Sequence, residues 1–217
     1  MAIYHIGEGD FVTKDLTSRH MRACEGFSAV VDVADGLWSS PSPCPRWDAR
    51  SVVEHIIRSH DVVLLGRLGT KPRLPHDDPA ARWTLTMAAI KGALTGTGEG
   101  LDLVHRVTNV DLVQLIPVLT TDVLVHTWDL ASSIGVRGSM DPELTVHVYE
   151  FAQLNVDHLQ QSGLFDSPVP VPRNADVPTR LVALLGRNPA WRASPQRRPQ
   201  NVDDSIGMTT NPAAMET

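Results

Sequence analysis

Apolar residues recur at three- and four-residue steps along most of the chain, which is the spacing of one face of an α-helix. The first such segment covers residues 11–36, and further helices are predicted at 49–68, 80–95, a segment ending at Ile134, 141–163 and 176–186. The links are short and no convincing hairpin interrupts them. The chain is therefore predicted to be all-α, an antiparallel four-helix bundle with an extra C-terminal helix.

Residues that start, stop or bend helices support these boundaries. Three prolines within 41–45 forbid a helix there, and Asp48 is a good N-cap for the helix that follows. Gly135 is a natural residue to follow the last turn of the fourth helix. Pro117 either marks the first turn of that helix or kinks it. The pattern at 101–110 is compatible with a short strand or a loop.

The domain organisation follows from length and from where the pattern stops. The chain has 217 residues, of which 42% are hydrophobic, enough for one domain of ordinary size. The helical periodicity is lost from residue 192 onward. We therefore expect a single domain over residues 1–191 and a disordered tail over residues 192–217.

Charge and cysteine content narrow the class of protein. The formal net charge is −6 and the helical part has no basic run, so nucleic-acid binding is not expected. No apolar run of 18 residues suggests a membrane span, and the first residues do not resemble a signal peptide. Two cysteines cannot form a disulfide framework, which favours a reducing, cytoplasmic setting.

Polar side chains interrupt the apolar stripes of two predicted helices. Each residue of a helix advances by about 100°, so Asp122 and His126 fall on the stripe that also carries Leu119 and Leu130. His55 similarly lies within the apolar stripe of the second helix. A carboxylate or an imidazole facing a core costs desolvation energy unless it is paired or bound to a metal ion.

These three residues suggest a metal site if the two helices pack against each other. Three protein ligands with a remaining open position are the arrangement of a catalytic site, and His55, Asp122 and His126 suit zinc best. Nickel, iron and manganese are also compatible with such ligands. The alternative interpretation is a hydrogen-bonded Asp122–His126 pair on a polar surface, or a satisfied histidine in the core.

The other histidines are weaker candidates. His60 follows His55 by five residues, which rotates it by about 140° around the helix. It is interpreted as a surface residue or as one that lines a channel. His20 lies on the inner stripe of the first predicted helix, where a role in a cavity is conceivable.

Each of three further side chains has two interpretations. Cys44, between two prolines, is either a reactive thiol or a small loop residue packed beneath Trp38 and Trp47. Asp129 and Glu54 are candidates for orienting a ligand imidazole. The simpler interpretation is that Asp129 fixes the helix end and that Glu54 points partly to solvent.

Two separated segments of the chain resemble one known family. Residues 38–55 read WSSPSPCPRWDARSVVEH, and residues 122–131 read DVLVHTWDLA. Both are similar to signatures of the mycothiol-dependent maleylpyruvate isomerase N-terminal family, within the DinB-like metal-binding superfamily. Segments 162–172 and 179–191 look like the end of its short actinobacterial branch. The likeness covers about residues 16–191.

The resemblance implies a DinB-like bundle whose divalent metal, most simply Zn2+, is held by His55, Asp122 and His126. The isomerase itself has glutamate where this chain has Asp122, and it carries a further domain for which residues 192–217 are too few. Maleylpyruvate is therefore not the expected substrate.

The expected function is that of a metal-dependent thiol S-transferase or isomerase. A low-molecular-weight thiol, with mycothiol as the expected co-substrate, would react with a small electrophilic molecule. The alternative is a non-catalytic metal-containing protein that binds a thiol or another small molecule, or one whose metal is structural. A monomer and a homodimer are equally compatible with the sequence.

Overall fold

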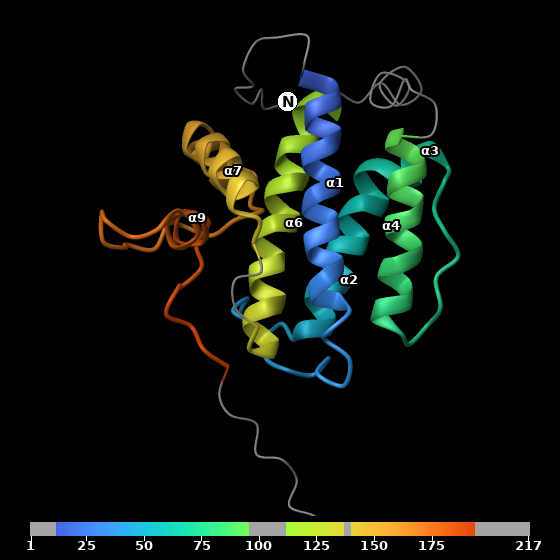
Figure 1. The fold of residues 1–217 in the computed structure, drawn as a ribbon, viewed down its shortest axis with the longest axis horizontal. Helices are drawn as coiled ribbons and strands as arrows, with labels where there is room; N and C mark the ends of the chain where they lie inside the picture. Colours follow the sequence, from blue (N-terminus) through green and yellow to red (C-terminus); the bar gives the residue numbers. More distant parts are fainter. Residues whose placement is uncertain (1–11, 96–111, 137–139, 194–217) are drawn as a thin grey trace, which may run out of the picture.

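The structure is a computed structural model that describes residues 12–95, 112–136 and 140–193, and these residues form helices and loops (Figure 1). The only pairing of β type within these ranges is an isolated bridge between Pro41 and Asp48. The all-α class predicted from the sequence is confirmed for the described residues. The helical elements, in chain order, are α1 (Val12–Val31), α2 (Ala49–His60), η1 (Asp61–Leu65), α3 (Gly66–Leu68), α4 (Pro79–Thr95), α6 (Leu112–Ile134), α7 (Pro142–Leu154), α8 (Val156–Gln161) and α9 (Val177–Leu184).

Four long helices pack in a closed cycle. α1 lies against α6, α6 against α2, α2 against α4, and α4 against α1. Figure 1 shows α1 and α6 running in one direction, while α2 and α4 run in the other. α7 and α9 pack against each other and add a layer beside α6.

The direction of α4 differs from the simple alternation that short links would produce. The connection from α3 to α4, residues 69–78, runs along the outside of the helices and returns the chain to the end where α2 began (Figure 1). Ten extended residues span up to about 33 Å, whereas 17 helical residues rise about 25 Å. This strap is therefore long enough to make α2 and α4 parallel neighbours.

The core lies where these four helices meet. Phe27 of α1 and Trp83 of α4 are buried with their rings in an edge-to-face contact, 4.9 Å between centroids. The indole N–H of Trp83 donates to Ser28 Oγ at 2.8 Å, so the buried ring leaves no unsatisfied donor. Along α6, nearly every side chain from Ile116 to Ala131 is buried, which makes α6 the central helix.

Helix ends lie close to where the sequence places them. Asp48 accepts a hydrogen bond from the Ser51 amide at 2.8 Å, as an N-cap does. Gly135 follows α6 with φ +77°, the left-handed conformation that favours glycine. The predicted helix at 141–163 is interrupted at Asn155, whose φ of −120° separates α7 from α8.

Several predictions concern residues at the margins of the described ranges. α6 continues through Pro117, which lies in its second turn. The segment 101–110, and the predicted disordered tail beyond residue 193, lie outside the described residues. Within the described ranges, no helix has both the length and the apolar character needed to cross a lipid bilayer.

Candidate metal centre

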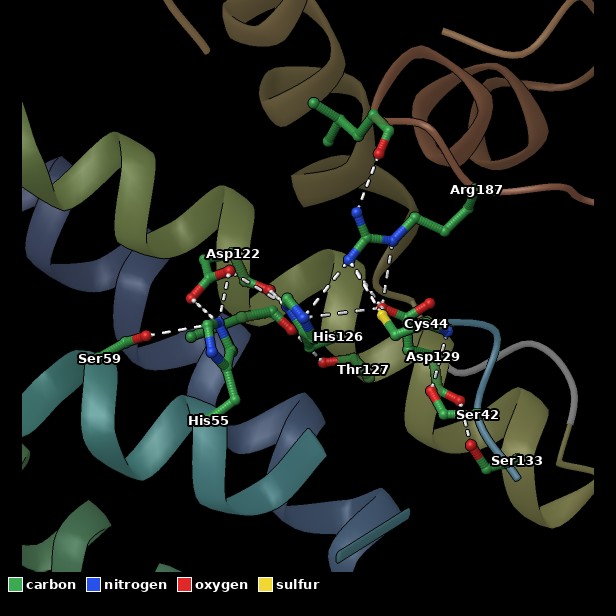
Figure 2. A network of polar contacts seen from close by, with 12 residues as sticks. Ser42, Cys44, His55, Ser59, Asp122, His126, Thr127, Asp129, Ser133 and Arg187 are labelled. Carbon is green, nitrogen blue, oxygen red and sulfur yellow. Dashed lines mark hydrogen bonds and ion pairs between the residues drawn. The ribbon is translucent and has the colours of Figure 1, made fainter. Parts of the chain in front are cut away.

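The packing of α2 against α6 brings His55, Asp122 and His126 together (Figure 2). His55 Nε2 lies 3.3 Å from Asp122 Oδ1 and 3.2 Å from Asp122 Oδ2. His126 Nδ1 lies 3.1 Å from Asp122 Oδ1, and the two imidazole centroids are 4.6 Å apart. The three side chains singled out in the sequence therefore converge on one place.

The group is buried on one side and open on the other. Asp122 and His126 are only 7% and 2% exposed, because α6 is covered on most of its surface. The side chain of His55 is 28% exposed. A molecule arriving from solvent would meet His55 first.

The carboxylate and the imidazole of α6 stabilise each other's charged forms. Burial by itself raises the pKa of Asp122, but attraction to His126 and hydrogen bonds from both histidines outweigh it and hold that pKa far below its usual value. Burial lowers the pKa of His126, but the attraction and hydrogen bond of Asp122, with further contributions from Cys44 and Asp129, together raise it well above its usual value. Without a cation, the pair is therefore a buried ion pair.

The donor set fits a divalent cation. Ligand atoms from the three residues lie within 4.8 Å of one another. Zinc bonds of about 2.0 to 2.2 Å in a tetrahedral site place neighbouring ligand atoms about 3.3 Å apart, close to the 3.2 Å between His55 Nε2 and Asp122 Oδ2. His126 Nδ1 also donates to the backbone carbonyl of Asp122 at 2.9 Å. Such a bond fixes the ring and leaves the other nitrogen free to coordinate.

Arg187, which the sequence analysis did not identify, lies against this centre. It follows α9 and is only 8% exposed. Its guanidinium donates to Asp129 Oδ2 from Nη2 at 3.0 Å and from Nε at 3.2 Å. Nη2 also lies 3.4 Å from His126 Nε2 (Figure 2). Burial lowers the pKa of Arg187, but attraction to nearby acidic groups, Asp129 foremost, and the hydrogen bond to Asp129 together outweigh it, so the guanidinium is charged.

Asp129 and Cys44 complete a second cluster on the other side of His126. The Cys44 thiol donates to Asp129 Oδ2 at 3.2 Å, and its sulfur lies 3.4 Å from Arg187 Nη2. Ligand atoms of Cys44, His126 and Asp129 also lie within 4.8 Å of one another. Asp129 is fully buried and its Oδ1 has no hydrogen-bond partner. It is thus an internal acid held by Arg187, rather than a residue that merely fixes the helix end.

Trp47 forms one wall of the centre. Its ring centroid lies 4.9 Å from that of His55 and 5.7 Å from that of His126. The proline-rich loop that carries it turns at Arg46, which has a φ of +67°, and closes with a hydrogen bond from the Ser42 amide to the Trp47 carbonyl at 3.0 Å. The loop therefore holds both Trp47 and Cys44 against the site.

The structure also tests the interpretations of Glu54 and His60 that were drawn from the sequence. Glu54 is paired with Arg82 of α4, with nitrogen–oxygen distances of 2.7 and 2.8 Å, and so does not orient a ligand imidazole. The placement of His60 on the surface or along a channel is wrong, because its side chain is completely buried. α2 packs against α4 as well as α6. A residue on the side of α2 that faces away from α6, such as His60, therefore still faces a neighbouring helix.

Comparisons with known proteins identify relatives but no named family. No protein-family model matches the chain, and no solved structure does. The chain is similar to two proteins of Mycobacterium tuberculosis, the uncharacterized protein MT0763 of strain CDC 1551 / Oshkosh and the uncharacterized protein Rv0738 of strain H37Rv. Each is 29% identical over 175 residues, which cover 77% of this chain and 95% of the relative.

Proposed function

We propose that the protein is a metal-dependent thiol S-transferase or isomerase on a four-helix bundle of the DinB-like type. The observation that carries this proposal is the convergence of His55, Asp122 and His126 at a half-open position between α2 and α6. A zinc ion there would have three protein ligands and a free position, which is the arrangement of catalytic rather than structural sites.

A divalent cation held by these residues would act as a Lewis acid and favour the thiolate form of a nearby thiol, which is its nucleophilic form. The residues of the chain would set the approach of the reactants. Trp47 offers an apolar face beside His55 on which the carbon skeleton of a small substrate could rest.

The reaction class follows from the nucleophile. The thiol gives up its proton to solvent, and its sulfur electron pair forms a bond to an electrophilic carbon of the substrate. In a transfer, the bond from that carbon to the leaving group breaks and the leaving group takes the electron pair. In an isomerisation, sulfur adds to an activated alkene, the adduct rotates about the former double bond, and the sulfur leaves again. Mycothiol is the proposed thiol, and the electrophile is a small molecule.

The proposal is tested by measuring the metal content and the turnover of the same protein. We expect the purified full-length protein to retain a divalent metal and to consume mycothiol in the presence of model electrophiles such as an activated alkene or an aryl halide. His55→Asn and Asp122→Asn should lower both the metal content and the rate at least tenfold. Glu54→Gln is the matched control, because Glu54 lies on the same helix as His55 but pairs with Arg82.

Two outcomes would contradict the enzyme assignment. Unchanged turnover in folded His55→Asn protein would exclude this centre as the site of the reaction. Metal binding and thiol-dependent thermal stabilisation without any product would instead indicate the non-catalytic thiol-binding or small-molecule-binding protein.

A further inference from the structure

A third cluster of metal-ligating side chains lies inside the bundle and shares no residue with the proposed catalytic centre. His20 and Cys24 are one turn apart on α1, and His60 is the last residue of α2. All three side chains are completely buried. His20 Nε2 lies 3.1 Å from His60 Nε2, and Cys24 Sγ lies 3.7 Å from the first nitrogen and 4.0 Å from the second.

The hydrogen bonds of His60 determine which of its nitrogens carries the proton. Its Nδ1 lies 2.7 Å from the carbonyl oxygen of Ile56. A carbonyl oxygen only accepts, so Nδ1 must donate. In a neutral ring the opposite nitrogen, Nε2, then carries no proton and presents its lone pair.

The same reasoning applies to His20. Its Nδ1 lies 3.1 Å from Thr120 Oγ1, and the Thr120 hydroxyl donates its single proton to the Ile116 carbonyl at 2.7 Å. Thr120 Oγ1 therefore accepts, His20 donates from Nδ1, and its Nε2 is also a lone pair. Two lone pairs then face each other at 3.1 Å, a repulsive arrangement that a cation between or beside them would relieve.

A proton is a poor candidate for that cation. Burial lowers the pKa of His20 far below its usual value, and repulsion from His60 lowers it further. Burial lowers the pKa of His60 as well. Both rings are therefore neutral at neutral pH. Burial also raises the pKa of the Cys24 thiol, so only coordination to a metal would deprotonate it.

We propose that His20, Cys24 and His60 form a buried site for a soft monovalent cation, namely Cu⁺. Metal–nitrogen bonds of about 2.0 Å and metal–sulfur bonds of about 2.3 Å place ligand atoms about 3.3 to 3.8 Å apart in trigonal or tetrahedral geometry. The three observed separations, 3.1, 3.7 and 4.0 Å, lie close to that range. Thiolate and imidazole are also the ligands that copper prefers.

Charge selects Cu⁺ over Zn²⁺ at this position. One thiolate cancels the charge of a monovalent cation, whereas a divalent cation would leave a net positive charge in the interior. An uncompensated buried charge is strongly unfavourable in a protein interior. The catalytic centre differs, because its carboxylate and open side can accommodate a divalent ion.

A surface cavity lies one residue away from the cluster, at Thr120. This cavity of about 210 Å³ is lined by residues of α1, α6 and α7, and Thr120, the hydrogen-bond partner of His20, is one of them. Leu16 and Pro117 form apolar parts of the same wall.

One other arrangement of protons competes with the metal. If the Thr120 hydroxyl turned from Ile116 to His20, His20 could donate from Nε2 to His60, and the chain of neutral hydrogen bonds would be complete. That arrangement predicts that no metal binds. The two alternatives therefore differ in a quantity that can be measured.

The experiment is an anaerobic titration of the reduced full-length protein with Cu⁺ supplied as its bicinchoninate complex. We expect the wild type to withdraw one Cu⁺ per chain, and copper X-ray absorption to show one sulfur and two nitrogen ligands. Cys24→Ser and His60→Asn should lose this copper. His60→Asn is the gentler variant, because the asparagine amide can still donate to the Ile56 carbonyl.

Matched controls separate this site from the catalytic centre. Cys44→Ser and the double variant His55→Asn/His126→Asn should retain the copper, and circular dichroism checks that each variant is folded. The proposal is overturned if the wild type takes no copper from the chelator. It is also overturned if Cys44→Ser loses the copper while Cys24→Ser retains it. If Cys24→Ser does not fold, His60→Asn and the X-ray absorption spectrum of the wild type decide the question.

Discussion

At the scale of single residues, the candidate centre depends on a buried charge network rather than on isolated ligands. Asp122 and Asp129 are both carboxylates of α6 that are almost inaccessible to water. Asp122 is compensated by His126 and His55, and Asp129 by Arg187. Removal of one partner from such a pair costs more than the pair itself contributes, because the remaining charge stays buried.

This network predicts a large effect of an Arg187→Met substitution. The change removes the cation and leaves the buried Asp129 carboxyl group without its partner, so we expect a loss of about 3 to 5 kcal/mol in the free energy of unfolding. Urea unfolding measures it. Arg82→Met is the control: its pair with Glu54 is partly exposed, and such pairs contribute up to about 1 kcal/mol. Equal losses in the two variants would contradict the assigned role of Arg187.

The sequence identified part of this network, and the reason is periodicity. His55, Asp122 and His126 stand out because each interrupts an apolar stripe of a regular helix. Arg187 lies in an irregular segment after α9, where no repeating pattern makes a buried charge conspicuous.

Cys44 and His60 illustrate two further limits of periodicity. Cys44 comes from a loop, so its contact with Asp129 required the tertiary structure. His60 was misplaced because one apolar stripe was assumed for a helix that is buried on more than one side.

At the scale of elements, short connections position the site more than the helices alone do. The segment after α9 turns at Gly186, which has a φ of +84° and immediately precedes Arg187. A Cβ atom at Gly186 would lie 2.4 Å from the Cβ of Asp166. This close approach fixes the backbone path that leads to Arg187, whose guanidinium contacts Asp129.

Gly186→Ala should therefore destabilise the fold and displace Arg187. A left-handed backbone costs an alanine roughly 1 to 2 kcal/mol, and overpacking adds about 1 to 3 kcal/mol. Gly135→Ala is the matched control, because Gly135 also has a positive φ but has no atom within 4 Å of the added methyl group. Urea unfolding should show the larger loss in the free energy of unfolding for Gly186→Ala. Equal losses in the two variants would show that Asp166 moves away from the added methyl group without an energetic penalty.

At the scale of the whole molecule, the sequence predicted the helical class and most helix ends but not the direction of every helix. Caps such as Asp48 and Gly135 act through neighbouring residues, so local sequence reveals them. The parallel course of α2 and α4 depends on a proline-containing strap that follows the outside of the helices. No local preference specifies where such a strap ends.

The whole-molecule arrangement also predicts how the protein responds to removal of metal. The core around Phe27 and Trp83 is built from apolar contacts that need no cation. We expect EDTA to leave the helical circular dichroism unchanged while lowering the melting temperature, and added Zn²⁺ to restore it in a concentration-dependent way. Mg²⁺ should not substitute, since it prefers oxygen ligands. Complete unfolding in EDTA would instead identify a structural metal.

The single ring of His126 contacts Asp122 on one side and Arg187 on the other, and the two contacts compete. Its Nδ1 is engaged by the Asp122 carbonyl, and its Nε2 faces the guanidinium of Arg187. A cation bound at Nε2 would meet the positive charge of Arg187 3.4 Å away. Loading the centre and seating the chain after α9 are therefore rival events at a single atom.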